Sequence, residues 1–117
     1  MKETEQEEFE KNLENLRQEL RRGTLVLAVL GRLKEPRYGY SLVETLAARG
    51  IQAEAGTLYP LLRRLETQGL LESEWETSGP KPRKYYVLTS RGERMLDLLS
   101  IEWQQITRQM IDLLREE

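Results

Sequence analysis

The sequence predicts a mainly α-helical fold with one small β-hairpin, an α+β arrangement. Apolar residues recur at helical spacing through most of the 117 residues. A Gly/Pro-rich loop at 78–82 separates two short runs that favour strands. A heptad pattern continues through the C-terminal part, 90–117. This length permits one domain with a modest core.

Composition excludes several classes of protein. Cysteine and histidine are absent, which removes disulfides, thiol catalysis and the commonest general base and metal ligand. No glycine-rich phosphate loop is visible, so we expect neither an enzyme nor a bound cofactor or metal. No apolar run approaches the roughly 20 residues that span a bilayer, and the N-terminus is acidic and polar. We therefore expect a cytoplasmic protein without a membrane segment.

The spacing predicts a first helix over residues 4–22. Its apolar residues form a narrow stripe, the seam, on an otherwise highly charged helix. The seam must therefore pack on another helix of this chain or of a partner. We describe residues 1–22 as an N-terminal accessory helix, which Gly23 interrupts before Thr24 caps the next helix. The seam residues are Phe9, Leu13, Leu16 and Leu20.

Residues 25–33 are apolar nearly all round, which predicts a central core helix. A turn at 34–37 and the cluster Tyr38-Gly39-Tyr40 precede a helix over 41–49, which Gly50 stops. The residues expected to face inward from it are Leu42, Val43 and Leu46.

After an extended connector at 51–55, residues 56–71 predict a short helix with two faces. Thr57 is the expected N-cap, Pro60 then takes the third helical position, and Gly69 ends the helix. Its apolar stripe is Leu58, Leu61, Leu62 and Leu65, which leaves Thr57, Tyr59, Arg63 and Arg64 for other surfaces. Such a helix suits insertion into a nucleic-acid groove; the alternative is an ordinary amphipathic helix with solvated arginines.

Residues 70–77 and 84–89 predict two strands around the loop at 78–82. In the first, Leu71 and Trp75 alternate with glutamates. The loop leads into Lys81-Pro82-Arg83-Lys84, the densest basic piece of the chain. The helices predicted at 41–49 and 56–71, joined by a short connector, have the helix-turn-helix pattern. A hairpin that follows this pattern is a wing, although a plain hairpin with solubilising lysines looks the same. Residues 23–89 thus predict a winged helix-turn-helix domain.

Residues 90–117 predict a long helix, which Thr89 or Ser90 caps and in which Ser90 and Glu93 have capping-box spacing. Its apolar surface would be exposed in a monomer, so we expect a dimerisation helix that pairs with a second copy. The seam is Leu96, Leu99, Trp103, Ile106, Met110 and Leu113. Trp103 is either a bulky core residue of this seam or one wall of a cleft for a small aromatic effector.

The net charge of −2 hides an uneven distribution. Residues 23–92 hold ten Lys/Arg against seven Asp/Glu, whereas both ends hold more acids than bases. The basic excess therefore lies in the domain that is expected to bind nucleic acid.

The run from Leu20 to Thr89 resembles the PadR-type winged-helix transcriptional regulators. The resembling residues are Leu20-Arg21-Arg22-Gly23, Tyr38-Gly39-Tyr40, Gly56-Thr57-Leu58-Tyr59-Pro60-Leu61-Leu62, Arg64-Leu65-Glu66, Gly69-Leu70-Leu71, Trp75, Arg83-Lys84-Tyr85-Tyr86-Val87-Leu88-Thr89 and Gly92. The resemblance implies a homodimeric repressor that binds a palindromic operator in double-stranded DNA and is relieved by a small-molecule effector. One departure is that residues 4–22 extend upstream of the usual start.

We expect DNA contacts from the recognition helix, the wing and the tyrosine cluster. The candidates are Tyr38, Tyr40, Thr57, Tyr59, Arg63, Arg64, Lys81, Arg83, Lys84 and Tyr85. The rival interpretation is a helical protein–protein adaptor that does not bind DNA. It would use the two end seams and leave Lys81–Lys84 unexplained.

Overall fold

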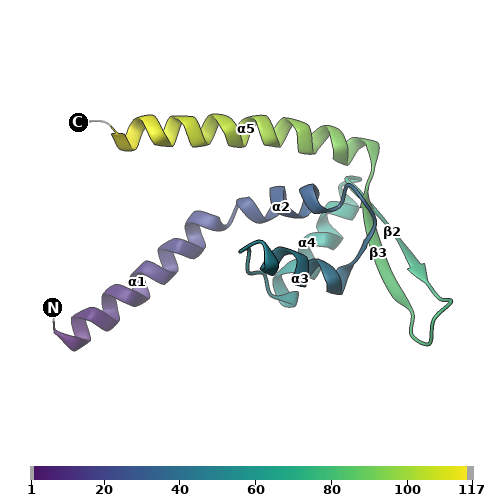
Figure 1. Ribbon diagram of the computed structural model, residues 1–117, viewed down its shortest axis with the longest axis horizontal. Helices are drawn as coiled ribbons and strands as arrows, with labels where there is room; N and C mark the ends of the chain where they lie inside the picture. The colour runs from purple at the N-terminus through teal and green to yellow at the C-terminus, as the bar shows by residue number, and fades with distance from the viewer. Residues whose placement is uncertain (1, 116–117) are drawn as a thin grey trace.

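The computed structural model describes residues 2–115. Within that range, the elements are α1 (Glu3–Arg21), α2 (Thr24–Arg32), β1 (Arg37–Tyr38), α3 (Gly39–Ala48), α4 (Ala55–Thr67), β2 (Leu71–Glu76), β3 (Arg83–Leu88) and α5 (Ser90–Arg115). Helices α2, α3 and α4 form a winged body with the strands, and α1 and α5 extend from it (Figure 1). The predicted α+β architecture, with its extra N-terminal helix and long C-terminal helix, is confirmed.

The wing contains one strand more than the sequence predicts. The sheet order is β1-β3-β2, and both pairings are antiparallel. Tyr38 of β1 lies opposite Tyr85 of β3. A strand of two residues is too short to show an alternation of apolar and polar positions, so only the tertiary contact with β3 defines it.

Helix α4 begins earlier than predicted. Its N-cap is Glu54, whose carbonyl accepts hydrogen bonds from the backbone N–H groups of Thr57 and Leu58 at 3.0 and 2.9 Å. The assignment of Thr57 as N-cap is therefore wrong, and Pro60 lies inside the helix. Because proline has no N–H, the Gly56 carbonyl one turn earlier cannot receive its usual helical bond.

The cap of α2 also differs from the prediction, whereas the cap of α5 is Thr89, one of the two residues predicted for it. Gly23, not Thr24, caps α2, and the Thr24 hydroxyl donates instead to the Arg21 carbonyl at 2.7 Å across the junction with α1. Before α5, the Thr89 hydroxyl accepts from the Gly92 N–H at 3.0 Å. Ser90 is thus the first helical residue and not the cap of a capping box.

The predicted stop of α4 is confirmed. Gly69 has φ +78°, a conformation that other residues rarely adopt. The Gly69 N–H donates to the Glu66 carbonyl, and the Leu70 N–H donates to the Leu65 carbonyl at 3.0 Å. This pair of bonds is a Schellman motif, which turns the chain directly from α4 into β2.

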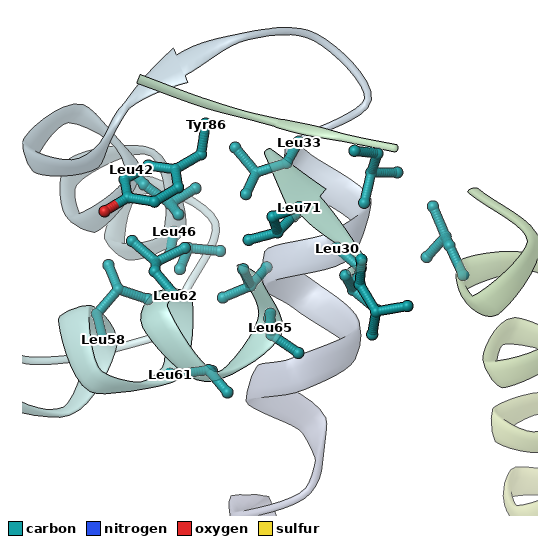
Figure 2. Packing of buried hydrophobic residues seen from close by; sticks show 14 residues of the cluster. Leu30, Leu33, Leu42, Leu46, Leu58, Leu61, Leu62, Leu65, Leu71 and Tyr86 are labelled. Carbon is teal, nitrogen blue, oxygen red and sulfur yellow. The ribbon is translucent and has the colours of Figure 1, made fainter. Parts of the chain in front are cut away.

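The core lies between α2, α3, α4 and the inner face of the hairpin (Figure 2). It consists largely of leucines, of which Leu30, Leu33, Leu42, Leu58 and Leu62 are fully buried. Each such side chain contributes about 1.5–3 kcal/mol by leaving water. Helix α5 adds Leu96, which is also buried, and the start of α5 is thereby attached to the body.

The two end helices leave this core. None of the residues of α1 is buried, and beyond Leu99 the described part of α5 has no buried residue. The radius of gyration is 17.8 Å, against about 13 Å for a compact chain of similar length. In Figure 1 both arms extend on the side away from the hairpin.

Candidate nucleic-acid interface

Helix α4 presents the residues expected to approach DNA on the side opposite the core. Its four stripe leucines are buried. Thr57, Arg63 and Arg64 are exposed, and Tyr59 is half-buried. A Cβ on Gly39 would lie 2.7 Å from Cε1 of Tyr59, so the glycine between the two tyrosines of the 38–40 cluster is what lets the Tyr59 ring lie against α3.

The antiparallel register gives the wing two chemically different faces. Trp75 lies opposite Lys84, and Ser73 lies opposite Tyr86, on the face that packs toward α4. Glu74 and Glu76 lie on the other face, opposite Tyr85 and Arg83. Because phosphates repel carboxylates, the face that carries Trp75 and Lys84 is the one suited to DNA.

Tyr38 is held within the base of the wing. Its hydroxyl donates to the Glu76 carboxylate, and this bond raises the pKa of Tyr38 and lowers the pKa of Glu76. The Tyr38 ring stacks on Tyr40 at 5.8 Å, and the Arg83 guanidinium lies 4.4 Å above it. These contacts fix the Tyr38 side chain against the sheet and place the Arg83 guanidinium over its ring.

Tyr85 is similarly occupied. Its hydroxyl donates to Glu74 at 2.8 Å, which raises the pKa of Tyr85. Tyr38 meets its ring edge-on, with centroids 6.0 Å apart. Of the four tyrosines in or beside the wing, which are Tyr38, Tyr40, Tyr85 and Tyr86, Tyr40 is the most exposed, at 51%.

Lys84 is half-buried and has a partner on α4. Its Nζ lies 3.8 Å from Oε1 of Glu66. The same ammonium lies 5.8 Å from the centroid of the Trp75 ring and 5.5 Å from that of Tyr86. Lys81, in contrast, is exposed in the loop.

A shallow hollow of about 370 Å³ lies between α4 and the wing. It brings together five of the residues predicted from the sequence, which are Tyr40, Tyr59, Arg63, Arg83 and Lys84. Tyr38, Thr57, Arg64, Lys81 and Tyr85 are not among its lining residues. Three cations and several aromatic rings around one opening suit a phosphate and its attached sugar or base.

Trp75 also lines this hollow and was not among the predicted DNA contacts. It is 60% exposed, which is unusual for so large an apolar side chain. Its alternation with the glutamates of β2 already separates it from the acidic face. The signal was therefore present in the sequence, but the register with Lys84 is needed to place Trp75 beside the cations.

The C-terminal seam divides into two parts. Leu96 is buried in the core of its own chain, and Leu99 packs against that core. The remaining four residues, Trp103, Ile106, Met110 and Leu113, are between 39% and 63% exposed. A second shallow hollow is lined by Trp103, Gln104, Thr107, Arg108 and Ile111.

Residues 2–115 contain neither a cluster of metal-binding side chains nor a helix suited to span a membrane. No group of three or more histidines, cysteines, aspartates or glutamates in this range is placed to hold a metal. Over the same residues, none of the helices is both long and apolar enough to cross a membrane.

The fold resembles solved regulators over nearly its whole length. A PadR family transcriptional regulator from Eggerthella lenta DSM 2243 is 50% identical, with a TM-score of 0.89 over 93% of this chain and 97% of that one. A PadR-like regulator from Bacillus cereus strain ATCC 14579 is 29% identical, with a TM-score of 0.75 over 85% of this chain and 99% of that one.

Sequence comparison agrees with the structural likeness. A transcriptional regulator of Mycobacterium tuberculosis (strain ATCC 25618 / H37Rv) is 39% identical over 59 residues, which are 50% of this chain and 55% of that regulator. This chain therefore matches only about half the length of that curated relative. The pattern of the "Transcriptional regulator PadR-like family" matches residues 26–98, and the chain belongs to this family of DNA-binding transcriptional regulators, which are not enzymes.

Proposed function

We propose that this chain is a homodimeric repressor that binds a palindromic operator. The observation that supports it best is the opening shared by α4 and the wing, whose lining includes Arg63, Arg83 and Lys84 beside aromatic rings. In this arrangement the exposed N-terminal part of α4 enters the major groove, and the loop at 77–82 with the start of β3 follows the DNA backbone. Two copies on successive half-sites would block polymerase access to a promoter.

The proposal divides the predicted contacts into two groups. Thr57 and Tyr59 lie near the start of α4, where side chains reach base edges, so they are assigned to sequence readout. The cations Arg63, Arg64, Lys81, Arg83 and Lys84 are assigned to phosphates, which fix position and carry no sequence information. Tyr40 and Trp75 provide the walls against which a sugar or base can pack. Tyr38 and Tyr85 are assigned to holding the wing that positions these cations.

The dimer is proposed to form through the exposed part of α5. Residues 23–89 are then the DNA-binding unit, residues 90–117 the pairing unit and residues 1–22 an accessory helix against the same bundle. Four apolar side chains of the seam that are between 39% and 63% exposed support this division. A partner that covers them removes a large apolar surface from water.

Selection of bound sequences from a random duplex pool tests the function most directly. We expect a palindrome whose half-sites lie about one helical turn apart, and binding that weakens steeply as salt rises. A selected site without two-fold symmetry would contradict the dimeric arrangement. Absence of salt-sensitive binding to any duplex would favour the helical adaptor.

A small aromatic effector is a second proposal, supported by the hollow beside Trp103. An effector acts only if it binds the DNA-competent and incompetent states with different affinities. We expect flat aromatic cations or phenols to quench tryptophan fluorescence. The chain has two tryptophans, so the quench should disappear in Trp103→Ala and persist in Trp75→Phe. Survival of the quench in a dimeric Trp103→Ala would exclude this site and leave Trp103 as a seam residue.

A further inference from the structure

Glu66 is an acidic residue of α4 that lies beside Lys84, one of the residues that line the hollow between α4 and the wing. It follows Arg63 by three positions on α4, and it is not among the residues that line the hollow. Its carboxylate is fixed by Ser73 of β2, whose hydroxyl donates to Oε2 at 2.5 Å. The other oxygen faces the Lys84 ammonium at 3.8 Å. Glu66 therefore touches both strands of the hairpin from the recognition helix.

Lys84 has a restricted position as a result. The carboxylate lies on one side of its ammonium, and the rings of Trp75 and Tyr86 lie 5.8 and 5.5 Å away. About a third of each of the Lys84 and Glu66 side chains is exposed. A phosphate that enters the hollow must compete with Glu66 for the charge of Lys84, whereas exposed Lys81 has no such competitor among the ion pairs of the described residues.

We propose that Glu66 is a positioning residue that withholds Lys84 from phosphates that are not optimally placed. A duplex whose backbone fits the hollow recovers the interaction with Lys84 together with those of Arg63 and Arg83. A duplex that fits poorly meets a lysine that remains paired with Glu66. Glu66 thereby lowers sequence-independent binding more than operator binding, which raises discrimination without a contact to any base.

The inference rests on the proposed assignment of this hollow to a phosphate, and a random-sequence duplex tests it. We expect Glu66→Gln to bind this duplex about twofold to fivefold more tightly, because partly exposed ion pairs contribute little more than this. The slope of log affinity against log salt should steepen by up to about one, since Lys84 now displaces a counterion from DNA. Glutamine keeps the shape and can still accept the Ser73 hydrogen bond.

Two controls separate this role from others. Glu72→Gln removes the same charge from the opposite, exposed face of β2 and should change the slope little. In a Lys84→Gln background, Glu66→Gln should have no further effect on the slope, because its action passes through Lys84. Thermal unfolding of each variant checks that the wing remains folded.

Each outcome has one meaning. A steeper slope of log affinity against log salt in Glu66→Gln, which is lost in the Lys84→Gln background, supports the inference. The same steepening with or without Lys84 would mean that Glu66 only repels phosphate, and an unchanged slope would mean that Lys84 is not withheld; either overturns it. Absence of salt-sensitive binding by the unaltered protein would instead contradict DNA binding itself, so the two failures are distinguishable.

Discussion

The winged body and the two end helices differ in what covers their apolar side chains. Leu62 of α4 is fully buried, whereas Leu20 of α1 is 80% exposed and Leu114 of α5 is 81% exposed. Both regions have apolar residues at helical spacing. Periodicity therefore shows that a face will be covered, but it does not show which chain covers it. The apolar side chains of the body are covered by the same chain, whereas those of the end helices are exposed, and we propose that a second copy covers them.

The largest effect should come from truncating the same residue type in the two regions. Leu62→Ala should lower the free energy of unfolding by about 2–5 kcal/mol, because it empties a fully buried site. Leu20→Ala should cost less than about 0.5 kcal/mol when the protein is dilute. Chemical denaturation at two protein concentrations measures both.

The comparison of two protein concentrations distinguishes burial within one chain from burial by a second copy. The cost of Leu62→Ala should be the same at both concentrations, since its neighbours belong to the same chain. The cost of Leu20→Ala should grow at the higher concentration if a second copy covers it. An equal, concentration-independent loss in both variants would mean that α1 packs on its own chain in solution.

A charge in the exposed seam should break the pairing of the end helices. Ile106→Asp should give a monomer in sedimentation, because an aspartate in a desolvated seam costs several kcal/mol. Operator affinity should then fall by about a hundredfold, since two half-sites no longer act as one ligand. Gln105→Asp adds the same charge off the seam and should remain dimeric. A dimeric Ile106→Asp would place the interface elsewhere.

An added methyl group at Gly92, where α5 meets the winged body, should destabilise the fold. A Cβ there would lie 2.1 Å from the Leu70 carbonyl oxygen and 3.0 Å from a methyl group of Leu88. Gly92→Ala should therefore lower the free energy of unfolding by about 1–3 kcal/mol. Gly31→Ala meets nothing within 4 Å and lies inside α2, so it should stabilise by about 0.5–1 kcal/mol. Thermal unfolding of the pair measures both signs.

Much of the body was predictable because its signals are local. The leucine stripe of α4, the glycine stop at Gly69 and the loop before Lys84 each depend on a few neighbouring residues. The start of α4 was not predictable in this way. Thr57 is a residue type that caps helices well, but the backbone is already helical from Ala55, two residues earlier. A side chain with capping ability does not cap when the backbone around it is already helical.

Five of the ten predicted DNA contacts line the hollow between α4 and the wing, but the pairing of these residues was not predictable. Arg63, Arg83 and Lys84 follow from charge and position along the chain. The partner of Lys84 does not, because Glu66 is 18 residues away and only the register of β2 with β3 brings it beside the wing. The same holds for Leu96, which fits the heptad seam by spacing yet is buried in its own chain. Spacing identifies the residues that share a helix face, and the tertiary contacts determine what that face packs against.

The smallest effect concerns Thr89, which links the end of α4 to the first turn of α5 by two hydrogen bonds. Its hydroxyl accepts from the Gly92 N–H at 3.0 Å and donates to the Gly69 carbonyl at 2.7 Å. Thr89→Ala should lower the free energy of unfolding by about 1 kcal/mol, the usual cost of a lost N-cap. Thr89→Ser keeps both bonds and should lose much less. Because these bonds lie within the body, sedimentation should still find a dimer in both variants. A monomeric Thr89→Ala would mean that the direction in which α5 leaves the body decides whether its exposed seam can meet a second copy.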